Sequence, residues 1–196
     1  MALITLVSGG LDSTLMALLL HRQGIQQYPL FIDYGQRSRE REWSACRVAF
    51  RKLRLPTPIA MNLRGFGQLI SSGLTRTNLR VNEDAFLPGR NLLFLIAGCA
   101  YASEKNAYGV AIGLLSERSR IFPDQTGEFV QRAEALMQSI LFRQIRIIVP
   151  LINFSKSEIV TIARERGVTG TYSCHSGTET PCGVCVSCLE TAGAIR

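Results

Sequence analysis

Residues 4–14, ITLVSGGLDST, constrain the fold more than any other part of the 196-residue chain. A short apolar run ends at Gly9 and Gly10, and an apolar helix pattern begins directly after them. Because glycine has no side chain, the backbone turns sharply there and its amides approach an anion closely. The N-terminus of the following helix adds amides and the positive end of its dipole. The stretch predicts a strand–turn–helix that holds phosphate, although a tight connection without a ligand leaves the same two glycines.

Asp12, Ser13 and Thr14 narrow the type of anion site. An aspartate repels a phosphate, so we expect Asp12 either to cap the helix or to hold a Mg²⁺ ion that bridges phosphates. The stretch lacks the longer glycine spacing and the lysine of a Walker loop, and it does not match the dinucleotide fingerprint. The sequence therefore favours a nucleotide-phosphate site of a different type.

Short apolar runs alternate with helical patterns along the chain. We expect strands at residues 2–8, 28–33, 57–63, 107–113 and 145–151. We expect helices at residues 12–23, 38–54, 91–105, 127–142 and 155–167. The alternation predicts an α/β fold with a doubly wound, mostly parallel five-stranded sheet and helices on both faces. In such sheets ligands bind beyond the carboxyl ends of the strands, where the winding direction switches.

Finer expectations concern helix ends and helix faces. Gly24 is expected to end the first helix, and Ser155 to cap the last one. The apolar face of helix 38–54 is expected to contain Trp43, Cys46, Phe50 and Leu53. The inner stripe of helix 127–142 is expected to contain Phe129, Ala133, Leu136 and Ile140. Residues 64–87 and the final thirty residues show no clear period, so we expect irregular structure there.

Four cysteines near the end have the spacing C-x7-C-x2-C-x2-C, at Cys174, Cys182, Cys185 and Cys188. Two-residue spacings let thiolates converge on one tetrahedral ion, which predicts a closed structural Zn²⁺ site. An iron–sulfur cluster has similar spacings, and a set of ordinary buried thiols is the plain alternative. We expect residues 168–196 to form a zinc-binding segment packed on a nucleotide-binding domain of residues 1–167. The remaining cysteines, at positions 46 and 99, are expected in the core.

Composition limits the class of protein. The N-terminal apolar run of about six residues is too short for a signal peptide, and no window is long enough to span a membrane, so we expect a cytoplasmic protein. The net charge of +7 suits a nucleic acid or a nucleotide phosphate, and equally a solvated arginine-rich surface. Aromatic residues are not interleaved with the basic ones, which counts against a nucleic-acid surface.

Five motifs occur in one order along nearly the whole chain: SGGLDST, DYGQRSRERE (33–42), LPGRNLLFL (87–95), PLINFSKSEIV (150–160) and the terminal cysteines. Together they resemble the 7-cyano-7-deazaguanine synthases of queuosine biosynthesis, a family of N-type ATP pyrophosphatases (PP-loop enzymes). The resemblance implies an ATP-dependent carbon–nitrogen ligase. Such an enzyme first adenylates the carboxylate of 7-carboxy-7-deazaguanine. Ammonia then displaces AMP to form an amide, and a second activation of the amide oxygen leads to the nitrile.

The resemblance also implies roles for residues of this chain. Catalytic roles fall on Asp12, Ser13 and Lys156. ATP contacts fall on the loop and two later positions: Val7, Ser8, Gly9, Gly10, Leu11, Asp12, Ser13, Thr14, Asp33 and Arg90. Substrate contacts fall on Gln36, Asn91 and Asp124. The implied cofactors are ATP, Mg²⁺ and Zn²⁺, the implied partners are the deazapurine carboxylate and ammonia, and a homodimer is left open.

One region departs from the family pattern. After the fourth expected strand the chain reads GLLSERSRIFPDQTGEF (113–129), in which only FPD matches clearly. This leaves open a PP-loop enzyme that adenylates a different carboxylate or amide. A rival from another class is a catalytically silent, zinc-containing nucleic-acid-binding protein.

Overall fold

The computed structural model describes residues 1–116 and 122–195, and within them a single five-stranded sheet has the order β3-β2-β1-β4-β5. All four strand pairings are parallel. The strands are β1 (Ala2–Val7), β2 (Gln26–Asp33), β3 (Ile59–Asn62), β4 (Gly109–Ala111) and β5 (Arg146–Ile148). The winding direction reverses between β1 and β4, as the predicted doubly wound fold requires. The predicted fold class is confirmed.

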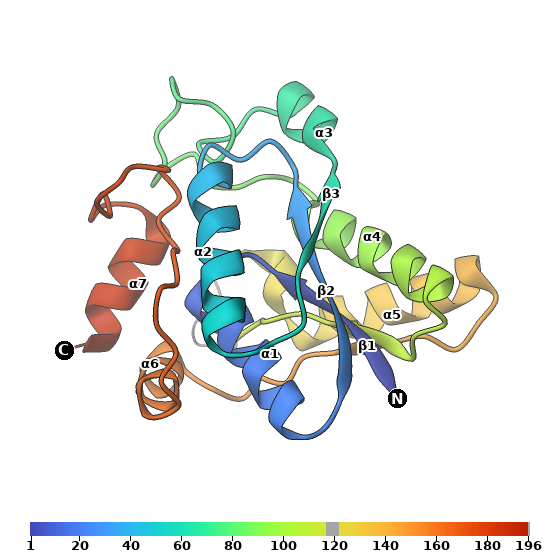
Figure 1. Ribbon diagram of the computed structural model, residues 1–196. Coiled ribbons are helices and arrows are strands. Elements are labelled where there is room, and N and C mark those ends of the chain that lie inside the picture. The colour runs from blue at the N-terminus through green and yellow to red at the C-terminus, as the bar shows by residue number, and fades with distance from the viewer. Residues whose placement is uncertain (117–121, 196) are drawn as a thin grey trace.

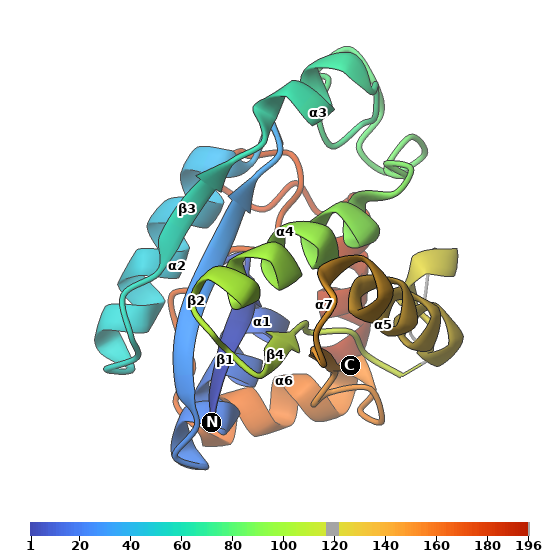
Figure 2. The ribbon, with the colours of Figure 1, turned by 90° about the vertical axis from the view of Figure 1, so that its right-hand side faces the viewer.

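Helices cover both faces of the sheet (Figure 1). One face carries α1 (Leu11–Arg22), α2 (Arg39–Lys52) and α6 (Lys156–Glu165). The other face carries α4 (Arg90–Glu104) and α5 (Gly127–Leu141), which lie side by side in Figure 2. Three further helices lie near the carboxyl edge: α3 (Arg64–Leu69), α7 (Val186–Ile195) and a short 3₁₀ helix, η2 (Pro123–Gln125).

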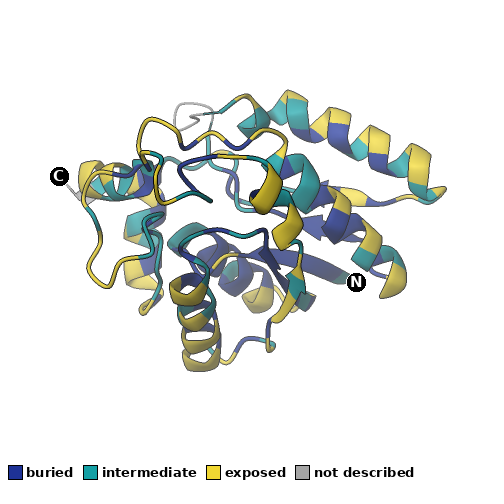
Figure 3. Ribbon diagram, turned by 90° about the horizontal axis from the view of Figure 1, so that it is seen from above, coloured by how far each residue is buried: buried dark blue, intermediate teal, exposed yellow. Residues whose placement is uncertain are grey.

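The two layers of helices enclose two separate apolar cores. Alternation along β1 sends Ile4 and Leu6 toward α4 and α5, whereas Leu3 and Val7 face α1, α2 and α6. Seen from the carboxyl edge in Figure 3, the outer faces of the helices are exposed. The strands β1, β2 and β4 are mostly buried, whereas the edge strand β3 is mostly exposed. Strands buried on both faces explain why their sequences read as nearly continuous apolar runs.

Helix ends follow the predicted caps. The Ser155 hydroxyl accepts a hydrogen bond from the Glu158 backbone N–H at 3.3 Å, and Glu158 accepts one from the Ser155 N–H at 2.7 Å. This reciprocal pair is a capping box at the start of α6. Gly24, with a φ of +73°, follows the last turn of α1 in the left-handed region that favours glycine. Both predictions are confirmed.

The predicted inner stripe of α5 is wrong at two positions. Leu136 and Ile140 are 46% and 51% exposed. The buried positions are Val130, Ala133 and Met137, of which Ala133 was predicted. Apolar residues cover much of the circumference of α5, so the helical period fits two neighbouring stripes equally well. Packing of α5 against α4 and the sheet decides between them.

Two helices were missed and one helix face was predicted correctly. Residues 64–87 contain α3, and the cysteine-rich end contains α7, which begins between two of the clustered cysteines.

In α2, Cys46 and Phe50 are fully buried and Trp43 packs on Phe31 with ring centroids 5.1 Å apart. Among the described residues, no helix is long and apolar enough to cross a bilayer.

The assignment of the α5 stripe can be tested with neighbouring residues. We expect Met137→Ala to lower the free energy of unfolding by about 2–5 kcal/mol, because it leaves a cavity in the core. Leu136→Ala removes a half-exposed side chain and should cost less than about 1 kcal/mol. Urea unfolding followed by circular dichroism measures both. Equal losses for the two variants would contradict the assignment.

Candidate active site

A tight turn at residues 8–10, here called the glycine loop, joins β1 to α1. Gly9 has a φ of +81°. A Cβ atom at Gly9 would lie 2.2 Å from the carbonyl oxygen of Glu42 and 2.9 Å from the backbone nitrogen of Cys46, both in α2. A larger residue would push α2 away from the loop, so glycine is required for conformation and for space.

Two serines brace the glycine loop. The Ser8 backbone N–H donates to the Ser13 hydroxyl at 3.1 Å, and that hydroxyl donates to the Gly10 carbonyl at 3.3 Å. The two serine hydroxyl oxygens are also 3.1 Å apart. The N-cap residue of α1 is Gly10, which has no side chain to cap the helix. The positive end of the α1 dipole is therefore directed at the space in front of the loop.

Asp12 does not cap α1, which removes one of its two predicted roles. Its carboxylate oxygens lie 2.7 and 2.9 Å from Lys156 Nζ. Lys156 is the first residue of α6, where the helix dipole disfavours a cation, and the Asp12 carboxylate offsets that cost. The Lys156 and Asp12 side chains are 10% and 28% exposed, so the pair is shielded but still open to a ligand.

A cavity of about 260 Å³ opens in front of the glycine loop. Many of the predicted site residues line it: Val7, Ser8, Gly10, Leu11, Asp12, Ser13, Gln36, Arg90 and Asn91. Five other predicted site residues do not line it: Gly9, Thr14, Asp33, Asp124 and Lys156. Of these, Lys156 contacts Asp12 and Asp124 contacts Asn91, which both line the cavity. Aromatic side chains form part of the wall, with Tyr34 and Phe94 in contact at a centroid distance of 5.4 Å.

Asp33, at the end of β2, is bound within the protein. Its carboxylate accepts hydrogen bonds from Arg64 Nε at 2.7 Å, Arg39 Nε at 3.1 Å and the Gly35 N–H at 3.2 Å. The side chain is only 5% exposed. Asp33 therefore holds the turn after β2 in place, and direct contact between Asp33 and ATP stays a prediction.

Gln36 is also engaged within the protein. Its Oε1 accepts from the Tyr34 N–H at 3.0 Å. Its Nε2 donates to the Ile32 carbonyl at 3.3 Å and to Glu42 Oε2 at 3.1 Å. Both amide hydrogens are used, so Gln36 fixes the orientation of Glu42, and contact between Gln36 and substrate stays a prediction.

Glu42 is a site residue that the sequence reasoning missed. It is buried in the cavity wall, and burial raises the pKa of its carboxyl. The sequence gave only a weak indication that Glu42 is buried, because a glutamate one turn after Ser38 in an amphipathic helix is expected on the exposed face. Only the packing of α2 on Gly9 turns Glu42 toward the cavity.

The Gly-Arg-Asn turn of residues 89–91 places Arg90 and Asn91 at the start of α4. Gly89, at a φ of +72°, is the N-cap. Asn91 Nδ2 donates to the Asp124 carbonyl at 2.9 Å, and the Asn91 N–H donates to Asp124 Oδ2 at 3.3 Å. Arg90 lies in the cavity wall near Tyr34, whose pKa burial raises to about 12. Asp124 therefore braces the α4 terminus; its predicted role in substrate recognition is untested, and residues 117–121 of the same loop lie outside the described residues.

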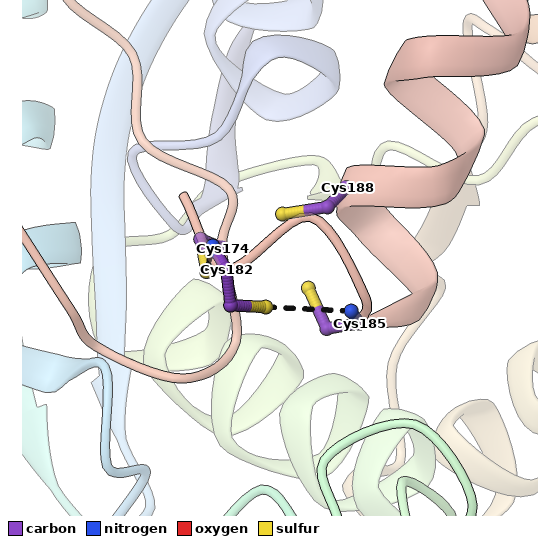
Figure 4. Close-up of side chains that lie close together, drawn as sticks. All are labelled: Cys174, Cys182, Cys185 and Cys188. Atoms are coloured by element: carbon purple, nitrogen blue, oxygen red, sulfur yellow. Dashed lines mark hydrogen bonds between the residues drawn. The ribbon is translucent and has the colours of Figure 1, made fainter. Parts of the chain in front are cut away.

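The four clustered cysteines converge, as Figure 4 shows. Their sulfur atoms all lie within 4.8 Å of one another. A tetrahedral zinc–thiolate site with bonds of about 2.3 Å places its sulfurs nearly 4 Å apart, so the set fits such an ion. Backbone N–H groups of Cys182 and Cys185 already donate to Cys174 Sγ (3.3 Å) and Cys182 Sγ (3.4 Å). With four sulfurs in one cluster, the donor set is that of a closed structural site.

The cysteine segment also forms one wall of the cavity. The Tyr172 N–H donates to the Gly9 carbonyl at 2.9 Å, and the Leu11 N–H donates to the Ser173 hydroxyl at 3.4 Å. His175, beside the first cysteine, lines the cavity, and burial together with nearby Arg90 lowers its pKa to about 4. From α7, Val186, Ser187 and Glu190 complete this wall. The sequence predicted a zinc-binding segment packed on the nucleotide-binding domain, and it assigned this segment no part in the cavity.

A family model described as "Queuosine biosynthesis protein QueC" matches residues 2–196. The chain belongs to the QueC family. Relatives named 7-cyano-7-deazaguanine synthase include those of Campylobacter curvus and Methanothermobacter thermautotrophicus. The first is 31% identical over 94% of this chain and 88% of the relative. The second is 30% identical over 97% of this chain and 92% of the relative. The resemblance seen in the five motifs is confirmed.

Solved structures similar to this QueC-family chain support the fold. A 4-thiouridine synthetase–RNA complex with bound ATP gives a TM-score of 0.55 at 18% identity, over 99% of this chain and 49% of that chain. A protein described as a predicted subunit of tRNA methyltransferase from Methanocaldococcus jannaschii gives 0.51 at 17% identity, over 87% of this chain and 90% of that chain. At these identities the likeness concerns the fold alone.

Thiol chemistry tests the cysteine assignment. Burial raises the pKa of Cys46 and of Cys99 to about 12, so both should resist a disulfide reagent in the native protein at pH 8. Of the four clustered thiols, Cys182 and Cys188 are partly exposed, so we expect reaction in metal-free native protein to begin at the cluster, and no thiol to react after one equivalent of Zn²⁺ is added. Cys46 and Cys99 should react only in guanidinium. Cys185→Ser should abolish stoichiometric zinc, and iron in place of zinc in the purified protein would contradict the assignment.

Proposed function

We propose that this chain is an ATP-dependent ligase that converts 7-carboxy-7-deazaguanine and ammonia into 7-cyano-7-deazaguanine. One observation carries the proposal: in a QueC-family chain, the glycine loop, Arg90 and Asp12, which is paired with Lys156, line a single cavity. Relatives that share about 30% identity over nearly the whole chain are named for this product. The cavity lies at the carboxyl edge of the sheet, where doubly wound folds bind ligands.

The reaction explains why such a cavity needs several kinds of group. A carboxylate is a poor electrophile because its oxygen is a poor leaving group. Transfer of AMP to that oxygen releases pyrophosphate and lets ammonia displace AMP to form the amide. A second transfer of AMP to the amide oxygen allows its loss with formation of the nitrile. Two ATP molecules are thus cleaved to AMP and pyrophosphate for each nitrile.

The residues around the glycine loop suit the pyrophosphate that leaves. Backbone amides in the first turn of α1, such as those of Asp12 and Ser13, have no acceptor within the helix and would donate hydrogen bonds to phosphate oxygens. Lys156, now paired with Asp12, can exchange that carboxylate for a phosphate oxygen when ATP binds. Mg²⁺, with Asp12 of α1 as a ligand, would neutralise further phosphate charge.

Arg90 and the cysteine segment have different tasks. The Arg90 guanidinium, at the start of α4, is suited to an anionic oxygen of either ligand. Zn²⁺, held by the four cysteines, would supply a structural cross-link. Residues 168–196 would then act as a zinc-binding segment that completes the nucleotide-binding domain of residues 1–167.

Product analysis tests the proposed function. The purified protein, incubated with ATP, Mg²⁺, ammonium and 7-carboxy-7-deazaguanine, should release AMP and form the nitrile, detected by mass spectrometry. Omission of ammonium should remove the nitrile. AMP release without any nitrile would contradict the proposed acceptor and favour another carboxylate or amide.

Variants of the ion pair test the ATP site. We expect Asp12→Asn and Lys156→Met each to lower the rate of AMP formation by about 10²–10³-fold, because each removes charge that acts on the phosphates. The double variant should lose no more than about tenfold beyond either single variant, since the two residues act as a unit. Lys105→Met, an exposed lysine at the end of α4, is the matched control. Near-normal AMP formation in the Asp12 variant would exclude this site.

A further inference from the structure

Glu42 is a buried carboxyl group that forms no ion pair with any described residue. Glu42 is 8% exposed, and no Lys, Arg or His nitrogen of the described residues lies within 4.0 Å of its carboxylate oxygens. Two carboxylates close by are paired, Asp12 with Lys156 and Asp33 with two arginines. A buried, unpaired carboxyl costs stability. Such a cost is commonly retained where a ligand completes the site.

Two donors hold the Glu42 carboxyl in a fixed orientation. The Ser38 hydroxyl donates to Oε1 at 2.7 Å, and Gln36 Nε2 donates to Oε2 at 3.1 Å. Gln36 is itself fixed by the Tyr34 N–H and the Ile32 carbonyl. A carboxylate oxygen can accept two hydrogen bonds, so each oxygen of Glu42 keeps one free acceptor site. The pair of oxygens thus forms a rigid double acceptor in the cavity wall.

The surroundings of Glu42 suit a flat aromatic ligand. Tyr34, Phe94 and Phe122 line the same cavity and offer ring surfaces. Arg90 also lines it and acts electrostatically on both Glu42 and Tyr34 without forming an ion pair with Glu42. A ligand ring can therefore meet aromatic side chains, an acceptor pair and a cation in one cavity.

We propose that Glu42 is the specificity residue for the acceptor, reading the adjacent ring N–H and 2-amino group of a guanine-type base. This inference rests on the proposed function and deepens it. Two neighbouring donors on one ring edge match two carboxylate oxygens as a bidentate pair. Adenine presents an amino donor beside a ring-nitrogen acceptor, so the base of ATP matches an ionised Glu42 with only one of its two groups. Glu42 thereby distinguishes the acceptor from the base of the co-substrate.

The substrate itself provides the first test. With the wild-type protein, kcat/KM for 7-carboxy-7-deazaguanine should exceed that for the analogue without the 2-amino group by about 10²-fold or more, because the analogue leaves a buried acceptor unpaired. Equal use of the two compounds would overturn the proposal. This comparison needs no variant, so it holds whatever substitution does to the fold.

A variant provides the second test. Glu42→Gln replaces one acceptor oxygen by a donor and should lower kcat/KM for the acceptor about 10²-fold. Preference for the 2-amino compound should shrink to less than about tenfold, while KM for ATP changes by less than about twofold. Glu40→Gln, the same change at an exposed position of α2, should leave all three values unaltered. An unchanged preference, or a loss confined to KM for ATP, would overturn the proposal.

Thermal unfolding separates a binding role from a structural one. Folding raises the pKa of the Glu42 carboxyl above the ordinary value of 4.5. Ionisation of Glu42 therefore lowers the free energy of unfolding as the pH rises above that ordinary pKa. The amide has no such cost, so Glu42→Gln should melt at the same temperature as wild type or higher at pH 7. A lower melting temperature together with an unchanged preference would assign Glu42 a structural role. If the wild-type protein forms no nitrile at all, the proposed function fails, and this inference fails with it.

Discussion

Three segments that are distant in sequence meet at one residue without a side chain. At Gly9 the glycine loop turns, α2 approaches to a distance that excludes any Cβ, and the Tyr172 N–H binds the carbonyl oxygen. Glu42 faces the cavity because α2 is packed on Gly9. The cysteine segment forms a wall because Tyr172 is bonded there. The shape of the cavity therefore depends on this close approach of backbones.

Charge is distributed around the cavity in a consistent way. Asp33 is neutralised by two arginines and stabilises the turn after β2, whereas Asp12 is neutralised by a lysine that a phosphate can take over. Glu42 accepts hydrogen bonds from Ser38 and Gln36 and forms no ion pair with any described residue. These three carboxylates show that residue type alone does not assign a role. Their partners distinguish the structural residue Asp33 from Asp12 and Glu42, for which we propose roles toward the phosphates and the acceptor.

The cysteine cluster and the glycine loop form one structural unit. Ser173 accepts from the Leu11 N–H, and the next residue, Cys174, is the first of the clustered thiols. Val186, Ser187 and Glu190 enter the wall from α7, which starts between the third and fourth cysteines. A metal bound by the four thiols would therefore hold part of the active-site wall in place, as well as the end of the chain.

Much of the architecture was determined by the sequence itself. The alternation of apolar runs and helices specified five parallel strands, because both periods arise from local backbone geometry. Local chemistry was likewise sufficient for the Ser155 cap, the glycine loop and the four converging cysteines. Tertiary structure alone decided which face of α5 is buried, that Asp12 pairs with Lys156 instead of capping α1, and that Glu42 is inside. Each of these depends on contacts between segments far apart in sequence, and a local pattern contains no information about which distant residue will lie opposite.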